Sequence, residues 1–352
     1  MFKFKKLLSL GVVTSLAFSL AACGGGETSP STSESSGGSD APVQEEEYVL
    51  KIAAGTMSPE FSLAKTWRYY EEELEARSDG RINVELYISG ELGGDRELSE
   101  AVQMGEIQMV APSTGAITGF SSAFNIFDLP FLFKDRETAY TVLDGEPGKK
   151  VLGTLDEIGL KGLGYFENGF RNLTNDVKPI ETAADIEGLS VRTMENDMHI
   201  EAWRSLGANP TPMSFEELYT ALQQGTIDGQ ENPLGLIRDI KLFEVQSHLA
   251  MTNHVYSPYV ILMHKGFYDS LPADLQLIVE EVTTDATEYN RGLTLEEEKD
   301  ARETLEAEGM QITELPAEEI AKIQEKMEPI YDQFKDRIGE DLLMEFLSMT
   351  KQ

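Results

Sequence analysis

Residues 166–174 read Phe166-Glu167-Asn168-Gly169-Phe170-Arg171-Asn172-Leu173-Thr174. Two further segments belong with it: Gly188-Leu189-Ser190-Val191-Arg192 and Asp228-Gly229-Gln230-Glu231-Asn232-Pro233. Two of the three segments carry an arginine beside apolar or small residues, and the third ends in Asn-Pro. A guanidinium group presents a rigid fork of N–H donors that matches a carboxylate. We therefore expect these segments to meet around one anionic ligand.

Length and charge narrow the class of protein. The chain has 352 residues, which predicts two domains rather than one core. Its hydrophobic content of 41% is ordinary for a globular protein. The formal net charge of −33 argues against nucleic acid as a partner, because nucleic acid requires a basic face. An acidic chain can still bind a small anion, since a cleft can carry a local field of opposite sign.

The N-terminus resembles a bacterial lipoprotein signal. Lys3, Lys5 and Lys6 precede an apolar run, and Leu20-Ala21-Ala22-Cys23 resembles a lipobox. We expect residues 1–22 to be a signal peptide and Cys23 to be lipidated, which would anchor the mature protein to a membrane. The alternative is a buried free thiol; no intramolecular disulfide can form, because Cys23 is the only cysteine. Residues 23–46 are rich in Ser, Gly and acids, which is typical of a flexible tether.

Strand and helix signals alternate from Tyr48 onward, which predicts an α/β fold. We expect strands at residues 48–54, 82–88 and 189–193, and a helix over 95–104 that stops at Gly105. Ser58-Pro59 is typical of a helix start. The chain after Leu271 is predicted to be almost wholly helical.

Two further helix starts bear on the site. Ser214 with Glu217 three residues later predicts a capping box. Asn232 followed by Pro233 could be the N-cap of a helix, which is the structural alternative to a ligand contact. Phe215 could likewise be only the first apolar residue of a helix that packs inward.

Several motifs occur in a recognisable order. They are Gly169-Phe170-Arg171-x-Leu173-Thr174-Asn175, Pro210-Thr211-Pro212-Met213-Ser214-Phe215-x-Glu217, and Ile227-Asp228-Gly229-Gln230-Glu231-Asn232-Pro233-Leu234. Together they closely resemble the solute-binding proteins of TRAP (tripartite ATP-independent periplasmic) transporters, the DctP-like family. The likeness extends from about Tyr48 to the C-terminal helices.

The resemblance implies a two-domain, periplasmic-binding-protein-like fold with a cleft between the domains and a long helix that spans both. It implies that domain I comprises residues 47–168 plus 257–294, and that domain II comprises residues 169–256 plus 295–352. The protein would be an extracytoplasmic receptor, lipid-anchored to the cell membrane. It would capture a C4-dicarboxylate, a sugar acid such as a uronate, or a related hydroxy acid, and deliver it to the permease subunits for ion-driven uptake.

The resemblance also assigns the site. Arg192 would clamp the ligand carboxylate, Arg171 and Asn232 would assist it, and Phe215 would close over the ligand. Strand-end positions add weaker candidates in the other domain or beside Arg171: Thr56, Glu91, Ser113 and Asn168. The family often has Gln where this chain has Glu91, so Glu91 would either repel a second carboxylate or accept ligand hydroxyls.

Other functional classes give a less complete account. A cell-surface enzyme acting on carbohydrate acids, either a lyase or a glycosidase, could use paired acids together with Arg171. A ligand sensor for a signalling kinase would share the same pocket. The four histidines lack the spacing of a metal site, and no nucleophile motif is present. We therefore expect no catalytic residues, no metal and no cofactor.

Overall fold

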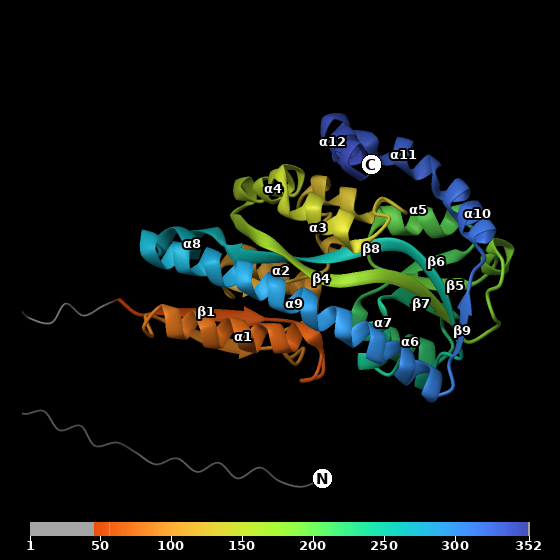
Figure 1. Cartoon of the computed structure of the whole chain (residues 1–352), viewed down its shortest axis with the longest axis horizontal. Helices are drawn as coiled ribbons and strands as arrows, with labels where there is room; N and C mark the ends of the chain where they lie inside the picture. Colours follow the sequence, from red (N-terminus) through yellow and green to blue (C-terminus); the bar gives the residue numbers. More distant parts are fainter. Residues whose placement is uncertain (1–45, 56, 351–352) are drawn as a thin grey trace, which may run out of the picture. The chain divides into compact units, whose positions relative to one another are not determined.

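In the computed structural model, β4 (Leu160–Asn175) and β8 (His248–His264) form the antiparallel centre of a nine-stranded mixed sheet (Figure 1). The structure describes residues 46–55 and 57–350. The predicted signal peptide, Cys23, almost all of the tether and Thr56 lie outside these residues. The described residues belong to one compact unit that starts at Glu45.

Parallel strands flank this centre on both sides. The strand order is β2-β1-β3-β8-β4-β7-β5-β6, and β9 pairs with β8. β1 pairs in parallel with β2 and β3, and β5 pairs in parallel with β6 and β7. Their bounds are β1 Tyr48–Ala53, β2 Ile82–Tyr87, β3 Met109–Val110, β5 Ser190–Thr193, β6 Asn209–Pro212, β7 Gly229–Asn232 and β9 Gln311–Glu314.

Helices connect these strands and complete the C-terminus. The bounds are α1 Ser62–Arg77, α2 Asp95–Met104, α3 Arg136–Asp144, α4 Glu146–Gly153, α5 Asp197–Ser205, α6 Phe215–Gln223, α7 Leu234–Asp239, α8 Lys265–Ser270, α9 Ala273–Ala307, α10 Ala317–Met327, α11 Pro329–Ile338 and α12 Glu340–Thr350. The longest, α9, packs against α1, β4 and α7 (Figure 1). Among the described residues, no helix combines the length and the apolar character needed to cross a membrane.

Both faces of the central strands are buried, which is the pattern of an α/β sheet covered on each side. Neighbouring side chains of β4 enter different cores: Tyr165 packs with Phe127 and the C-terminal helices, whereas Phe166 packs with Trp67 of α1. The same alternation holds along β8. Since successive side chains of a strand point to opposite faces, the sheet separates the core that contains Tyr165 from the core that contains Phe166.

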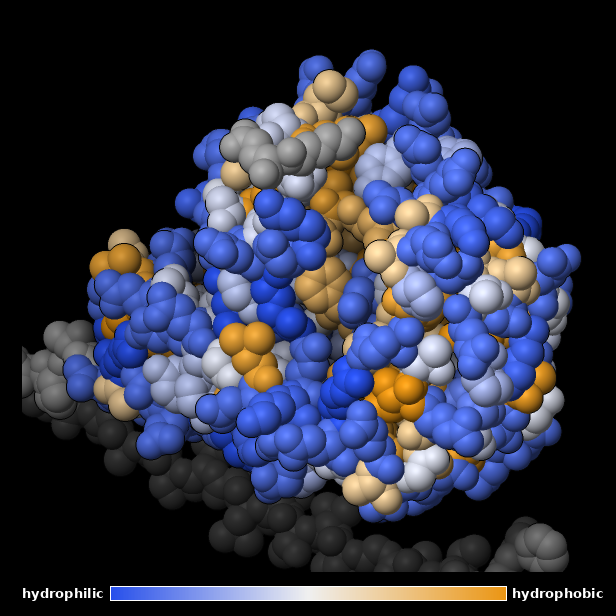
Figure 2. Space-filling view, turned by 45° about the vertical axis from the view of Figure 1, so that its right-hand side comes forward, coloured by the Kyte–Doolittle hydropathy of each residue, from blue (hydrophilic) through white to orange (hydrophobic). Residues whose placement is uncertain are grey.

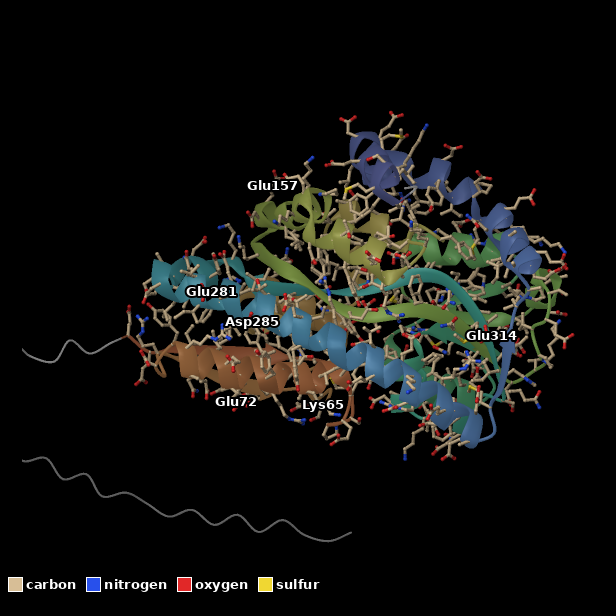
Figure 3. The ribbon with its side chains drawn as sticks, in the orientation of Figure 1. Lys65, Glu72, Glu157, Glu281, Asp285 and Glu314 are labelled. Atoms are coloured by element: carbon tan, nitrogen blue, oxygen red, sulfur yellow. The ribbon has the colours of Figure 1, made fainter. Side chains whose placement is uncertain are left out.

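Charged side chains lie mainly outside these cores. The labelled acids Glu72, Glu157, Glu281 and Glu314 are exposed (Figure 3). On the face drawn in Figure 2, hydrophilic residues cover most of the surface and apolar residues lie mainly between them. In the described part of the chain, most acidic side chains therefore lie at the surface.

The predicted α/β fold class is confirmed, and several element boundaries are corrected. The helix predicted from Ser58-Pro59 begins at Ser62, because Ser58 binds Asp239 through its backbone N–H (2.9 Å) and its hydroxyl instead of capping α1. Ser214 is the N-cap of α6 but makes no side-chain capping bond. The chain after Leu271 is helical, as predicted, apart from short connections and the strand β9.

The predicted domain boundaries fall inside continuous elements. The 168/169 boundary lies within β4, the 256/257 boundary within β8 and the 294/295 boundary within α9. β4 and β8 have register irregularities near the first boundary, between Phe166 and Gly169 and between Arg171 and Leu173. These bulges are places where a strand can bend without ending.

Candidate functional site

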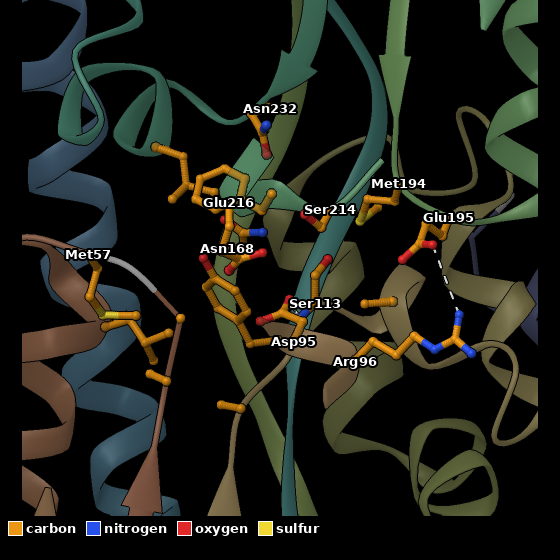
Figure 4. A pocket seen from close by; sticks show the side chains of 18 of the residues that line it. Met57, Asp95, Arg96, Ser113, Asn168, Met194, Glu195, Ser214, Glu216 and Asn232 are labelled. Atoms are coloured by element: carbon orange, nitrogen blue, oxygen red, sulfur yellow. Dashed lines mark hydrogen bonds and ion pairs between the residues drawn. The ribbon is translucent and has the colours of Figure 1, made fainter. Parts of the chain in front are cut away.

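A cavity opens where the carboxyl ends of several strands meet the start of α2 and α6 (Figure 4). Its empty volume is about 880 Å³, part of which is open solvent. This is the position at which open α/β sheets bind ligands. The cavity is lined by Ala54, Gly55, Met57, Phe61, Leu63, Asp95, Arg96, Glu97, Ala111, Ser113, Ala116, Asn168, Arg171, Arg192, Met194, Glu195, Met213, Ser214, Phe215, Glu216, Asn232, Leu236 and Tyr259.

Arg192 is a buried cation whose guanidinium is held by a backbone carbonyl. It lies in β5 with 3% of its surface exposed. Its Nε and Nη2 donate to the carbonyl oxygen of Met213 at 3.0 and 2.8 Å. Glu195 forms no salt bridge with Arg192, and within residues 46–55 and 57–350 no acid lies within 4.0 Å of the Arg192 nitrogens. Burial lowers the pKa of Arg192 to about 10, so the group stays charged at neutral pH without a paired anion.

Arg171 has a different environment, because the protein itself supplies its anion. Arg171 Nε donates to Glu231 Oε2 at 2.5 Å, and Nη2 donates to Glu231 Oε1 at 2.9 Å. Nη2 also contacts the carbonyl oxygen of Glu231 and Oδ1 of Asn232, at 2.7 and 3.0 Å. A two-point carboxylate contact of this kind fixes the plane of the guanidinium. Arg171 therefore lines the cavity as part of a neutral, rigid pair.

Glu231 is the centre of a buried network behind the cavity wall. Its carboxylate lies 3.1 Å from Nε2 of His254 and 3.7 Å from Nδ1 of His199, and Nε2 of His199 lies 3.0 Å from Asp128. Burial opposes the charge on Glu231, but Arg171 and the two histidines outweigh it and hold its pKa well below the usual range. This network keeps Arg171 in place.

At neutral pH one of the two histidines, His199, is charged and the other, His254, is neutral. For His199, burial disfavours the charge but Asp128 and Glu231 raise its pKa to about 9, so it is protonated. For His254, burial lowers the pKa and leaves the ring neutral. Its Nδ1 lies 2.8 Å from the hydroxyl of Thr252, so Nδ1 accepts from Thr252 while Nε2–H donates to Glu231.

Asn168 carries unused hydrogen-bonding capacity. Its side chain is 6% exposed and lies in the middle of the cavity view (Figure 4). Both Oδ1 and Nδ2 lack a partner among the described residues. Buried polar atoms are rarely left unpaired, because each costs about 1–3 kcal/mol. An unpaired amide on a cavity wall is therefore a strong indication of a ligand contact.

The other expected residues lie in different places. Ser113, Asn232 and Phe215 line the cavity, although the Asn232 amide already binds Arg171 and donates to Gln230 at 2.6 Å. Asn232 is not an N-cap, since it lies in β7 and Pro233 precedes α7. Thr56 lies outside the described residues, although both neighbours line the cavity.

The expectation that Glu91 lines the cleft is wrong. Glu91 is exposed and folds back on its own turn, where its Oε2 accepts from the backbone N–H of Ser89 at 2.9 Å. Asp95, four residues later at the start of α2, takes the place on the cavity wall. Sequence reasoning missed Asp95, as it missed Glu216 and the partners of Arg171. The available signal for Asp95 was its position as the first helical residue after a Gly-Gly turn.

In the described part of the chain, no group of three or more His, Cys, Asp or Glu side chains could hold a metal ion. The wall chemistry consists of guanidinium, amide, hydroxyl and carboxylate groups. This arrangement can hold a small anion and its hydroxyl groups by hydrogen bonds.

Comparison with known proteins gives one family. The profile described as "Bacterial extracellular solute-binding protein, family 7" (DctP) matches residues 53–337. The C4-dicarboxylate-binding periplasmic protein DctP of Rhodobacter capsulatus is 34% identical over 313 residues, which cover 88% of this chain and 93% of that protein.

Solved structures agree in fold. The sugar acid binding protein DctPAm of Advenella mimigardefordensis, in complex with galactonate, has a TM-score of 0.84 at 36% identity and covers 87% of this chain and 98% of its own. A TRAP periplasmic solute-binding protein of Sulfurospirillum deleyianum with bound succinate has a TM-score of 0.81 at 33% identity, with 86% and 99% covered.

Proposed function

The chain belongs to family 7 of the bacterial extracellular solute-binding proteins, and from that premise we propose that it captures a small organic acid through an arginine–carboxylate salt bridge. It is a binding protein and not an enzyme. It delivers the acid, chemically unchanged, to the permease subunits of a TRAP transporter for ion-driven uptake. The candidate cargoes are C4-dicarboxylates, sugar acids and related hydroxy acids.

The observation that carries this proposal is the buried guanidinium of Arg192. A cation removed from water is costly unless a counter-charge reaches it. Arg192 has one backbone carbonyl as its hydrogen-bond partner and lies on the wall of the cavity. A ligand carboxylate would supply the missing charge where water is largely excluded, so the salt bridge would be stronger than at the surface.

The residues that line the cavity come from both proposed domains, and this explains why a ligand would close the domains around it. Asp95 and Ser113 come from the proposed domain I (47–168 plus 257–294), whereas Arg192 and Phe215 come from the proposed domain II (169–256 plus 295–352). A ligand that touches both sets stabilises the closed form over the open one, which is the differential affinity that a hinge motion requires. Bends at the bulges of β4 and β8 would accommodate this motion.

The test is a thermal-shift panel of organic acids with an Arg192→Ala variant. A cognate acid at about 100 times its Kd stabilises the protein by about 2.7 kcal/mol. Removing one partner of a buried charge pair costs about 2–5 kcal/mol of binding, so Arg192→Ala should lose the ligand-induced shift. Arg204→Ala, which removes an exposed arginine of α5, is the matched control. Calorimetry that gave equal affinity for wild type and Arg192→Ala would contradict the clamp.

We also propose that Cys23 anchors the protein to the outer side of the cell membrane by lipidation. The support is the Leu20-Ala21-Ala22-Cys23 lipobox after a positively charged start. Cys23→Ser should release the protein from the membrane fraction, and persistent membrane association of this variant would count against the anchor.

A further inference from the structure

Two carboxylates share the cavity wall with Arg192. Asp95 is fixed at the start of α2, where its Oδ2 accepts from the backbone N–H of Ser113 at 2.9 Å. Glu216 reaches toward the same place from the start of α6, and an added Cβ on Gly94 would lie 2.5 Å from its Oε2. Both acids lie around Asn168 in the close view (Figure 4).

The local charges favour a ligand with one carboxylate. Glu231 already compensates Arg171. Arg96 also lines the cavity, but it is exposed and two acids of the protein face it, Glu100 at 3.3 Å and Glu195 at 4.0 Å. Arg192 therefore remains as the cation for the ligand, while Asp95 and Glu216 would face the rest of it.

We propose that the cavity selects a polyhydroxy monocarboxylate over a dicarboxylate, with Asp95 and Glu216 accepting hydrogen bonds from the ligand hydroxyls. The inference rests on the proposed function, because it assumes that Arg192 holds the carboxylate. From the sequence we expected Glu91 to repel a second carboxylate or to accept ligand hydroxyls. In the structure Asp95 and Glu216 are the acids in that position. A second carboxylate near two anions would be repelled, whereas a hydroxyl group donates a hydrogen bond to either one.

Two further observations support this selection. The unpartnered amide of Asn168 offers a donor and an acceptor, which suits a hydroxyl group better than a second carboxylate. Burial, and then the nearby charge of Glu216, raise the pKa of Asp95 to about 6, while Arg192 acts in the opposite direction. The negative charge on Asp95 is already unfavourable where it lies, so a second negative charge beside it would cost further free energy. Sites built to pair with hydroxyls also reject analogues that lack them.

The test compares ligands that differ only in the second carboxylate. D-galactonate is paired with galactarate, D-erythronate with meso-tartrate, and succinate serves as a dicarboxylate without hydroxyls. By titration calorimetry at pH 7.5, we expect at least one aldonate to bind ten times or more as tightly as its matched dicarboxylate. Asp95→Asn and Glu216→Gln should each reduce this ratio threefold or more. Glu91→Gln, which removes an exposed acid outside the cavity, should leave the ratio unchanged.

The outcomes separate this inference from the proposed function. If a dicarboxylate binds as tightly as its aldonate, or if neither variant changes the ratio, the selection is overturned while loss of binding in Arg192→Ala would still support the clamp. If Arg192→Ala binds every acid as wild type does, the clamp fails and the selection fails with it. Ligand-free melting temperatures close to that of wild type show that a variant is folded.

Discussion

Raising the pH from 6 to 9.5 should destabilise the wild-type protein more than a His199→Gln variant. Asp128 and Glu231 outweigh burial and raise the pKa of His199 to about 9, whereas an unfolded histidine titrates near pH ~6.5. A folded pKa above the unfolded one gives stability that is complete below about pH 6.5 and is lost as the pH rises through about 9. Burial lowers the pKa of His254, so this ring loses its proton at a lower pH than His199 does.

The size of the effect follows from these two values. A difference of roughly 2.5 in pKa corresponds to about 3 kcal/mol, of which about 2 kcal/mol remains at pH 7.5. Urea unfolding of the ligand-free proteins at pH 6, 7.5 and 9.5 measures it. Glutamine keeps a hydrogen-bonding side chain but no charge, so the variant reports how all other groups titrate. Equal loss of stability in both proteins would show that Asp128 and Glu231 do not hold a proton on His199.

Three other changes test separate parts of the site. Asn168→Ala should weaken ligand binding about tenfold by calorimetry without lowering the unfolding midpoint, because the amide has no partner to lose; a lower midpoint with unchanged affinity would make its role structural. Gly94→Ala should weaken binding because the new methyl group would displace the Glu216 carboxylate, and the same substitution should have no further effect on binding in a Glu216→Ala background, where no carboxylate remains to be displaced. Glu231→Gln should cost about 3–5 kcal/mol in urea unfolding, since Arg171 would be left buried without its anion; a cost under ~1 kcal/mol would contradict the pairing.

Sequence signals correctly predicted those helices and strands that depend on residues close by in the chain. The helix expected over 95–104 is α2, and Gly105 ends it in the left-handed conformation, with φ of +80°. The elements that were misjudged depend on distant partners. Asp239, which no local pattern connects with Ser58, removes that residue from the start of α1. β4 and β8 continue through bulges, and only the facing strand shows that each is one strand.

The sequence predicted the arginine on the cavity wall, Arg192, but not the acids beside it, Asp95 and Glu216. Arg192 stands out because few arginines occur at a strand end in so acidic a chain. The acids do not stand out, since the sequence contains 62 of them. Glu91 and Asp95 are four residues apart, and the turn between them decides which one reaches the cavity. Glu231 forms a salt bridge with Arg171 because β7 pairs with β4. This pairing is a long-range contact.

The acidic surface and the two cavity acids, Asp95 and Glu216, both disfavour a second negative charge on a ligand. At physiological salt, exposed charges are screened over about 8 Å, so the acidic exterior gives no long-range attraction for an anion. Affinity must then come from short-range contacts inside the cavity, where Arg192 provides a buried positive charge bound by the carbonyl oxygen of Met213. A dianion meets the unfavourable exterior field with twice the charge of a monoanion, and inside the cavity its second charge meets Asp95 and Glu216. The acidity of the chain therefore favours a small anion that carries one charge near Arg192 and presents neutral hydrogen-bonding groups elsewhere.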